Sequence, residues 1–593
     1  MHPYTSPRRL VGGTLAAGLV AGMLGLTAAQ ADAAPATGLK GKTLIVKGTG
    51  AADRLALRLH AGAPDKIDVD VGDNGSADLV VARDKVERIR VKGGGGSDQI
   101  RIDDANGAFT TTIPTRIDGQ GGNDAIRGGS GAERLNGDGG NDTIDGNGGN
   151  DVANLGAGRD RFIWDPGDGS DTVEGRRGAD TMTFNGSGAN ESFRVSANGR
   201  RTRLTRDVGA ITMDFDGIET VDVNSLGGND VVNVDDLART NVRTVNHDEA
   251  GGLSGSAPDT GNDQTIVNAT NAKDAITAAG AAGSAAVTGL AATVNVAHAD
   301  PASDALTVNA LGGDDRVDAS ALGADAAKLT QDGGAGNDTL LGGRGNDVQI
   351  GGDNNDALDG NQGNDTALMG AGDDRFTWDP GDGSDIVEGQ AGSDTLAFNG
   401  ANVAEAFDVS ANGGRVRFFR NVANITMDLN DVEAIDLNAL GGTDQLTVND
   451  LTGTDLTAVN TDLAATIGGT TGDGAQDQVI VNATNGADAI RAAGSGGTAS
   501  VNGLSAAIRV AHAEAAQDTL TVNALGGADV VDGSGLAADA IRLEASGGDG
   551  ADVLIGGAGP DTLRGDANDD VLLGGPGLDV LDGGPGNNTV IQD

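Results

Sequence analysis

The chain has 593 residues, of which 100 are glycine and none is cysteine, and its formal net charge is −47 at pH 7. Abundant glycine without abundant proline excludes a collagen-like chain, and the lack of cysteine excludes a disulfide framework and a cysteine-ligated zinc site. The acidic balance argues against nucleic acid and anionic membrane surfaces as partners, because both attract basic proteins. A chain this acidic repels itself, so we expect compact folding to need bound cations.

The N-terminus has the pattern of an export signal. Arg8 and Arg9 precede an apolar run of small residues that extends to about Ala29, and the cleavage motif Ala31-Asp32-Ala33 follows. This order predicts a secretory signal peptide over residues 1–33, and therefore a secreted or cell-surface protein. The paired arginines leave a twin-arginine route open, and an uncleaved anchor is the alternative to cleavage. No other segment is long and apolar enough to span a membrane.

Residues 34–117 form an N-terminal region that we expect to be β-structured. Four of its segments alternate apolar and polar side chains with period two, which is typical of strands with one buried face. These segments are Lys42–Val46, Leu55–Leu59, Ile67–Val71 and Ile89–Val91. A lone glycine-rich turn that ends at Asp98 offers one carboxylate to a calcium ion.

A nine-residue repeat begins at Gly119 and organises the rest of the chain. Acidic residues stand nine positions apart, and a mostly apolar residue follows each of them two positions later. The acidic residues of the first five units are Asp124, Glu133, Asp142, Asp151 and Asp160. Glycines fill the first half of each unit, which gives the pattern G-G-x-G-x-D-x-U-x, with U apolar. A flexible linker needs no such phase, so the preserved spacing favours a folded structure over a glycine-rich linker.

The two halves of each unit predict both a fold and a ligand. Glycine tolerates positive φ, so the first half is a tight turn, and the second half is a minimal strand with one apolar face. Strands of alternate units then stack in parallel as two short sheets. Asp124 and Asp142 fall on one edge, and Glu133 and Asp151 on the other. Stacked carboxylates about 4.8 Å apart repel unless a cation lies between them, and calcium prefers the carboxylate and carbonyl oxygens that these turns supply.

The repeats resemble the hemolysin-type, or repeats-in-toxin (RTX), calcium-binding nonapeptide repeats. The resemblance implies a parallel β-roll with calcium ions between the turns, and it carries ligands over only where an acidic residue occupies the sixth position of a unit. It does not imply pore formation, because the sequence shows no amphipathic toxin segment. Many proteins of this family leave the cell through a C-terminal signal, so the N-terminal signal predicted here is a departure from the family.

A larger repeat of 214 residues relates whole regions of the chain. Trp164 recurs as Trp378 and His298 as His512, and the match continues without a gap from one repeat block through a spacer into the next. The chain therefore divides into repeat blocks at 118–183, 332–397 and 546–593, and β-rich spacers at 184–331 and 398–545. We expect an all-β protein in which parallel β-roll blocks alternate with solenoid-like spacers.

The candidate calcium ligands are the acidic residues at the sixth position of the units in all three blocks. They are Asp124, Glu133, Asp142, Asp151, Asp160, Asp171, Asp180, Asp338, Asp347, Asp356, Asp365, Asp374, Asp385, Asp394, Asp552, Asp561, Asp570 and Asp579. Glu133 departs from the aspartate pattern, and its longer side chain is expected to misplace the carboxylate. Asn588 stands where the second block has Asp374, so the last site loses its charge, as suits a terminal unit. We expect multiple calcium ions (Ca²⁺), bound with uneven affinity, as the cofactors.

No catalytic constellation is found in the sequence. It has no H-E-x-x-H motif or zinc-ligand spacing, no G-x-S-x-G elbow and no phosphate-binding loop. His298 and His512 are interpreted as copied solenoid positions rather than a catalytic pair. Trp164 and Trp378, where two residues are inserted between units, are expected to cover the core rather than bind a ligand.

We therefore expect a secreted calcium-binding repeat protein with a structural or cell-surface role and no enzymatic activity. Metal binding outside the cell would drive folding of the roll. One alternative is an adhesin or matrix protein whose spacers bind a partner, such as a cell-wall or matrix component. The other is a polysaccharide-active β-solenoid enzyme that uses carboxylate catalysis.

Overall fold

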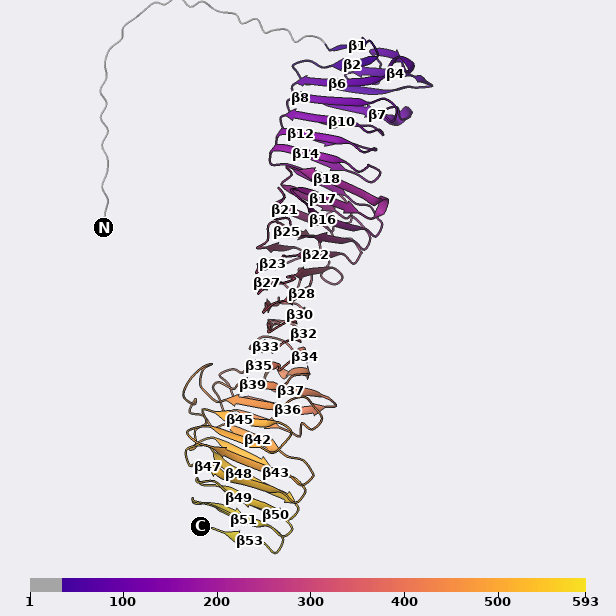
Figure 1. Ribbon diagram of the computed structural model, residues 1–593. Coiled ribbons are helices and arrows are strands. Elements are labelled where there is room, and N and C mark those ends of the chain that lie inside the picture. Colours follow the sequence, from indigo (N-terminus) through magenta and orange to yellow (C-terminus); the bar gives the residue numbers. More distant parts are fainter. Residues whose placement is uncertain (1–34, 593) are drawn as a thin grey trace, which may run out of the picture.

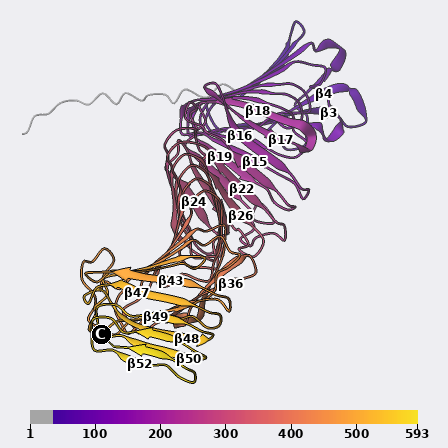
Figure 2. The same ribbon diagram turned by 60° about the horizontal axis from the view of Figure 1, so that its bottom comes forward.

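The chain folds into two long β-sheets that face each other along one axis. The computed structural model describes residues 35–592, so the signal peptide predicted over residues 1–33 lies outside the described residues. Figures 1 and 2 show the strands stacked across the long axis, with the first described residues at one end and the C-terminal strands at the other. Sheet A has 26 strands, from β1 (Ala36–Lys40) to β52 (Val580–Asp582). The strands of sheet B pair one after another from β5 (Leu79–Ala82) to β53 (Thr589–Ile591).

The N-terminal region begins both sheets. Its other elements are β2 (Thr43–Lys47), β3 (Arg54–His60), β4 (Ala63–Val71), the 3-10 helix η1 (Arg83–Lys85), β6 (Arg88–Gly95), β7 (Gln99–Asp103) and η2 (Asp104–Asn106). β1 and β2 form an antiparallel hairpin in sheet A, and β3, β4 and β5 form an antiparallel meander in sheet B. β6 pairs in parallel with β2, and β7 with β3, so the solenoid already starts here. The four strands predicted from period-two alternation are confirmed as β2, β3, β4 and β6.

Short strands alternate between the two sheets through each repeat block. The first block contains β8 (Thr115–Gly121), β9 (Ala125–Arg127), β10 (Arg134–Gly139), β11 (Thr143–Asp145), β12 (Val152–Gly158), β13 (Arg161–Trp164), β14 (Thr172–Gly178) and β15 (Thr181–Asn185). β8, β10 and β12 pair in parallel in sheet A, and β9, β11 and β13 in sheet B. Two units therefore complete one turn of the structure, and the predicted parallel β-roll is confirmed.

The second and third blocks repeat this pattern. The second contains β28 (Lys328–Ala335), β29 (Thr339–Leu341), β30 (Val348–Asp353), β31 (Ala357–Asp359), β32 (Thr366–Ala371), β33 (Arg375–Trp378), β34 (Ile386–Ala391) and β35 (Thr395–Asn399). The third contains β48 (Arg542–Asp549), β49 (Val553–Ile555), β50 (Thr562–Ala567), β51 (Val571–Leu573), β52 and β53.

The two spacers continue the same solenoid with longer connections. The first contains β16 (Ser192–Asn198), β17 (Arg201–Arg206), η3 (Val208–Ala210), β18 (Ile211–Asp216), β19 (Thr220–Asn224), β20 (Val231–Val234), β21 (Thr244–Asp248), β22 (Gln264–Asn268), β23 (Ala275–Gly280), β24 (Ala285–Thr288), β25 (Thr293–Ala297), β26 (Ala305–Asn309) and β27 (Arg316–Leu322). The second contains β36 (Ala406–Asn412), β37 (Arg415–Arg420), η4 (Val422–Asn424), β38 (Ile425–Asn430), β39 (Ala434–Asn438), β40 (Gln445–Val448), β41 (Ala458–Asp462), β42 (Gln478–Asn482), β43 (Ala489–Gly494), β44 (Ala499–Asn502), β45 (Ala507–Ala511), β46 (Thr519–Asn523) and β47 (Val530–Leu536).

Each spacer inserts one antiparallel meander into each sheet. In the first spacer these are β16–β17–β18 in sheet A and β23–β24–β25 in sheet B. The strands on either side pair in parallel, as β20 does with β22 and β19 with β21. The solenoid-like character predicted for the spacers is confirmed. Residues 35–592 contain no helix that is long and apolar enough to cross a membrane.

A thin hydrophobic core runs between the sheets, and the apolar residue of each unit points into it. Ile126, Leu135, Ile144, Ala153 and Phe162 are each at most 1% exposed. Stacked sheets lie only about 10 Å apart, so aliphatic side chains fill this space and few aromatic residues are needed. Burial of each larger side chain contributes about 1.5–3 kcal/mol.

Trp164 fills the core where two extra residues separate successive units. Its ring stacks on Phe184 with centroids 4.0 Å apart, and its Nε1 donates to the carbonyl oxygen of Gly169 at 2.8 Å. Trp378 stacks on Phe398 at the same distance, 4.0 Å. All four rings are buried. The expectation that both tryptophans cover the core is confirmed.

Candidate calcium sites

The repeat carboxylates form two ladders, one at each edge of the roll. Each stands directly before a strand, and the backbone N–H of most of them donates to a carboxylate oxygen one full turn later. Asp124 N–H reaches Asp142 Oδ1 at 2.8 Å, and Asp142 N–H reaches Asp160 Oδ1 at 2.8 Å. Glu133 N–H and Asp151 Oδ1 are joined in the same way at the opposite edge, at 2.6 Å. The structure thus places these residues on the two edges that the repeat spacing predicts.

The second carboxylate oxygen of most ladder residues is buried and has no hydrogen-bond partner within residues 35–592. A buried polar atom left unpaired costs about 1–3 kcal/mol, and more when it is charged, so an orphan that recurs at every turn fits a bound cation. Among the predicted ligands, the orphan is Oδ2 of Asp124, Asp142, Asp151, Asp160, Asp171, Asp180, Asp338, Asp356, Asp365, Asp374, Asp394, Asp552 and Asp570, and Oε1 of Glu133.

Beside a glycine, a carbonyl oxygen approaches several of the orphan oxygens. At Gly137, a Cβ atom would lie 2.3 Å from Asp142 Oδ2 and 2.4 Å from the carbonyl oxygen of Leu155. At Gly119, a Cβ atom would lie 2.3 Å from Asp124 Oδ2 and 3.0 Å from the carbonyl oxygen of Gly137. The carboxylate and carbonyl oxygens therefore converge on a small space that only glycine leaves open. Such an all-oxygen donor set fits Ca²⁺.

In the last unit, an asparagine amide replaces the carboxylate and removes its negative charge. Asn588 Oδ1 accepts from Asp570 N–H at 2.8 Å, which continues the ladder. Asn588 Nδ2 donates to the carbonyl oxygens of Gly583 and Gly584, at 2.6 and 2.9 Å. In the aspartate units a carboxylate oxygen takes the place of Asn588 Nδ2. This oxygen has no hydrogen to donate, so a cation is needed between the carboxylate and the carbonyl oxygens.

Burial disfavours the charged form of these carboxylates. Burial, and then the charges of neighbouring ladder residues, raise the pKa of Asp142 to about 7 and the pKa of Asp151 to about 9. In the second block the same causes raise the pKa of Asp356 to about 7 and that of Asp365 to about 8. An adjacent cation opposes this shift, because opposite charge favours the ionised carboxylate. The ladders therefore favour the uptake of either a cation or protons.

Sequence comparison agrees with this geometry. The family described as the RTX calcium-binding nonapeptide repeat matches residues 116–132, 127–162, 166–186, 332–367, 350–377, 380–402, 546–581 and 565–591. This chain carries RTX hemolysin-type calcium-binding repeats in multiple copies. No curated protein matches the chain significantly. RTX repeats bind Ca²⁺, and the buried ladder oxygens of this chain fit that ion.

The first RTX unit of sheet A in each block differs from the others. Gly129 N–H donates to Glu133 Oε2 at 3.0 Å, and Gly557 N–H donates to Asp561 Oδ2 at 2.6 Å. Asp347 receives the same kind of bond in the second block. In these units a backbone N–H already donates to the carboxylate. We therefore expect them to bind a cation more weakly than the units that follow.

The two remaining predicted ligands, Asp385 and Asp579, also stand in the ladders. Asp365 N–H donates to Asp385 Oδ1 at 2.8 Å, and Asp561 N–H donates to Asp579 Oδ1 at 3.0 Å. Asp579 is only partly buried, and its Oδ2 accepts from Gln592 Nε2 at 2.7 Å. Its surroundings therefore differ from those of the buried ladder residues.

The ladders extend beyond the RTX blocks, which the nine-residue spacing does not predict. Asp98 N–H donates to Asp124 Oδ1 at 2.8 Å, and Asp315 N–H donates to Asp338 Oδ1 at 2.7 Å. Outside the blocks, Oδ2 is a buried orphan at Asp98, Asp230, Asp263, Asp315, Asp444 and Asp529. Most of these aspartates precede an apolar residue by two positions, and that is the signal that identifies them. Their turns differ in length, so the nine-residue phase is lost.

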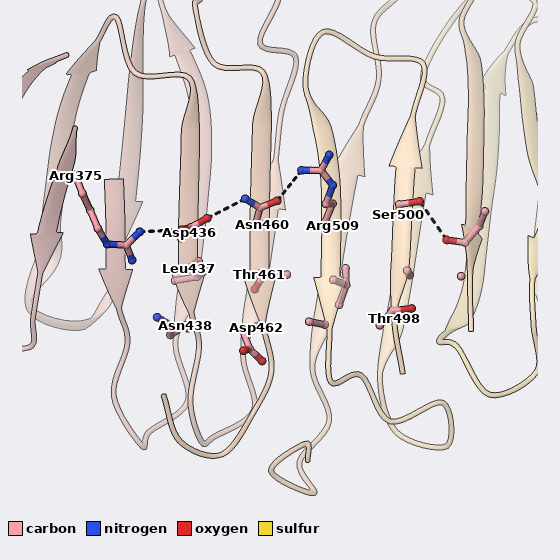
Figure 3. A pocket seen from close by; sticks show the side chains of 15 residues that line it. Arg375, Asp436, Leu437, Asn438, Asn460, Thr461, Asp462, Thr498, Ser500 and Arg509 are labelled. Atoms are coloured by element: carbon pink, nitrogen blue, oxygen red, sulfur yellow. Dashed lines mark hydrogen bonds and ion pairs between the residues drawn. The ribbon is translucent and has the colours of Figure 1, made fainter. Parts of the chain in front are cut away.

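A groove lined by polar and apolar side chains lies on the outer face of sheet B, from the end of the second repeat block into the second spacer (Figure 3). Figure 3 shows Arg375, Asp436, Asn460 and Arg509 in a row across neighbouring strands. Arg375 Nη1 lies 3.1 Å from Asp436 Oδ2, and Asn460 Nδ2 donates to Asp436 Oδ1 at 2.8 Å. Arg509 Nη1 donates to Asn460 Oδ1 at 3.2 Å. The row presents guanidinium and amide groups together at the surface.

The duplicated histidines lie far apart, one in each spacer. His298 Nδ1 lies 2.7 Å from Asp248 Oδ1, and His512 Nδ1 lies 2.6 Å from Asp462 Oδ1. The histidine and the aspartate of each pair occupy equivalent positions in the two spacers. The two histidines are therefore copies of one position and not partners in one site.

Proposed function

We propose that this is a secreted calcium-binding protein whose RTX roll folds on Ca²⁺ outside the cell and serves a structural or cell-surface role. The observation that carries the proposal is the recurring pair of buried oxygens, one from a carboxylate and one from a carbonyl, at successive turns. Without a cation these oxygens repel one another, so the free energy of calcium binding becomes free energy of folding.

The proposed location follows from the N-terminal sequence and from the calcium supply. Residues 1–33 have the charged, apolar and cleavage regions of a signal peptide. Extracellular calcium-binding modules typically have dissociation constants of about 10⁻⁴ to 10⁻³ M, so the chain would remain unfolded in the cytoplasm and fold after export. The proposal assigns the chain no catalytic activity, in keeping with a sequence that contains no catalytic motif.

Circular dichroism of residues 34–593 during a calcium titration tests this proposal, with magnesium as the control. We expect a transition from coil to β-structure with calcium and none with magnesium, which demands a smaller octahedral site. A chain that is already folded in chelator and does not respond to calcium would overturn the proposal.

A second candidate function is that of an adhesin or matrix protein, and the groove of the second spacer favours it. Arg509 is replaced by Asn295 at the same position of the first spacer, so the two spacers present different surfaces. The test compares the binding of purified cell-wall polysaccharide to the calcium-loaded wild type and to Arg509→Asn. Binding that weakens in the variant supports this candidate, and equal binding or none rejects the groove as its site.

A further inference from the structure

A cluster of three buried carboxylates lies in the first spacer, outside every segment that matches the RTX family. One carboxylate oxygen each from Glu249, Asp263 and Asp304 lies within 4.8 Å of the others. Each of the three residues is at most 2% exposed. Asp263 and Asp304 belong to a spacer ladder, where Asp263 N–H donates to Asp304 Oδ1 at 2.8 Å. Glu249 is not a ladder residue, so it brings a third negative charge to this point.

Two neighbouring side chains orient the carboxylate of Glu249. His247 Nδ1 lies 2.8 Å from Thr265 Oγ1 and 3.1 Å from Glu249 Oε1. Thr265 Oγ1 lies 3.4 Å from Glu249 Oε1 and donates to it. His247 and Thr265 are both buried, on β21 of sheet B and β22 of sheet A. Glu249 Oε1 is therefore held by both sheets, as expected for a positioned ligand.

The other oxygen of Glu249 has no hydrogen-bond partner in the described part of the chain, and neither has Asp263 Oδ2. Both residues are more than nine-tenths buried, so water does not solvate these oxygens. Three carboxylates brought together in a buried place repel one another. A divalent cation among the three carboxylates would offset this repulsion and supply the positive partner that these oxygens lack.

The second spacer provides an internal comparison. Positions 214 residues later keep the two ladder aspartates, as Asp477 and Asp518. His247, Glu249 and Thr265 are instead replaced by Thr461, Leu463 and Val479. Leu463 and Val479 are buried in the core, at 3% and 1% exposure. The fold therefore accepts apolar residues at these positions, so the polar set of the first spacer is not required for folding.

We propose that Glu249, Asp263 and Asp304 form an additional site for a hard divalent cation, of the Ca²⁺ or Mn²⁺ class, in the core of the first spacer. Carboxylate oxygens without a sulfur ligand favour this class of ion. His247 and Thr265 are positioning residues that orient Glu249 toward the ion. The second spacer lacks this site. The proposal goes beyond calcium binding by the RTX blocks, because it concerns other residues and a ligand set without nine-residue spacing.

Anomalous X-ray scattering from crystals of the secreted chain grown with Mn²⁺ tests this site directly. We expect one peak among Glu249, Asp263 and Asp304, and no equivalent peak beside Leu463. A first spacer without a peak overturns the proposal, whether or not peaks appear in the RTX blocks. Peaks in the blocks alone would leave the proposed function of the RTX repeats intact, so the two failures are distinguishable.

Three variants test the ligands in solution, with bound Mn²⁺ counted by mass spectrometry of the metal. The triple variant His247→Thr, Glu249→Leu, Thr265→Val copies the packing of the second spacer and should bind one ion fewer than the wild type. The reverse variant Thr461→His, Leu463→Glu, Val479→Thr should bind one ion more. Glu249→Gln keeps the shape of the side chain and should weaken the site at least tenfold. Unchanged ion counts in all three variants would overturn the proposal.

Discussion

Asn588 and Asp570 occupy successive positions of one ladder. They differ in the hydrogen bonding of Asn588 Nδ2 and Asp570 Oδ2, the side-chain atoms outside the ladder bonds. Asn588 Nδ2 donates to the carbonyl oxygens of Gly583 and Gly584 at 2.6 and 2.9 Å. Asp570 presents a buried Oδ2 with no hydrogen-bond partner within residues 35–592. One amide thus makes the contacts that a carboxylate makes only with a cation, and the substitution of one for the other changes the metal requirement of a unit.

Asn588→Asp should convert the last unit into a calcium-dependent one. In chelator, the variant loses two hydrogen bonds and sets a carboxylate against two carbonyls. These groups are half-buried or exposed, so the cost should be below the roughly 1–3 kcal/mol of a fully buried unpaired group. In calcium the cost should disappear and one more ion should bind. The calcium midpoint in a circular dichroism titration and calcium counting measure both effects. Asn587→Asp adds the same charge at an exposed position and serves as the control; the same ion count in both variants would contradict the prediction.

Gly137→Ala should destroy one calcium site without a change of charge. The added Cβ would lie 2.3 Å from Asp142 Oδ2 and 2.4 Å from the carbonyl oxygen of Leu155, where it displaces both ligand oxygens. Overpacking of this kind costs about 1–3 kcal/mol. We expect a higher calcium midpoint in the circular dichroism titration. Gly188→Ala is the matched control, because its Cβ meets no atom within 4 Å. Equal midpoints for the two variants would refute the assignment.

The response of the chain to pH should reverse between chelator and calcium. Burial raises the pKa of Asp142 to about 7, of Asp365 to about 8 and of Asp151 to about 9. A carboxyl whose folded pKa exceeds its unfolded value of about 4 binds more protons when folded. The calcium-free fold should therefore be most stable near pH 4 and lose stability as the pH rises toward 9.

With calcium the sign is opposite, because the ion binds the ionised carboxylate and protons compete with it. We expect calcium affinity to fall as the pH is lowered from 8 to 5. Circular dichroism of the chain in chelator at several pH values measures the first trend, and calcium titrations at the same pH values measure the second. A calcium-free chain that gains stability as the pH rises would show that the ladder carboxylates are ionised in the folded state even without metal.

Trp164→Ala should destabilise the roll strongly, because the ring is buried and stacked on Phe184 at 4.0 Å. Truncation of a buried aromatic residue costs about 3–5 kcal/mol. Trp164→Phe should lose less, since it keeps the stack and gives up the hydrogen bond to Gly169. Urea unfolding in saturating calcium provides the comparison, and Leu253→Ala, at a side chain 64% exposed, is the control. A Trp164→Ala variant as stable as that control would argue against a core role.

Much of this site can be predicted from the sequence because the nine-residue period determines it locally. The glycines specify the turn, the aspartate precedes the strand, and the apolar residue two positions later faces the core, as Asp142 and Ile144 show. Asp230 and Asp315 occupy the same ladders, but their turns vary in length, so periodicity does not identify them. Asn588 is recognisable in the sequence as a lost charge, whereas its two hydrogen bonds appear only in the structure.

The sequence by itself determined the RTX repeats, the 214-residue duplication and the pairing of units at two edges, because each depends on spacing along the chain. Only the tertiary structure decided how far the ladders extend and which acids meet outside the blocks. Asp263 and Asp304 are 41 residues apart, yet a hydrogen bond of 2.8 Å joins the backbone of one to the carboxylate of the other. Connections of different lengths join the strands of the spacers. Contacts between successive turns there are therefore set by strand register, which cannot be read from the distance along the sequence.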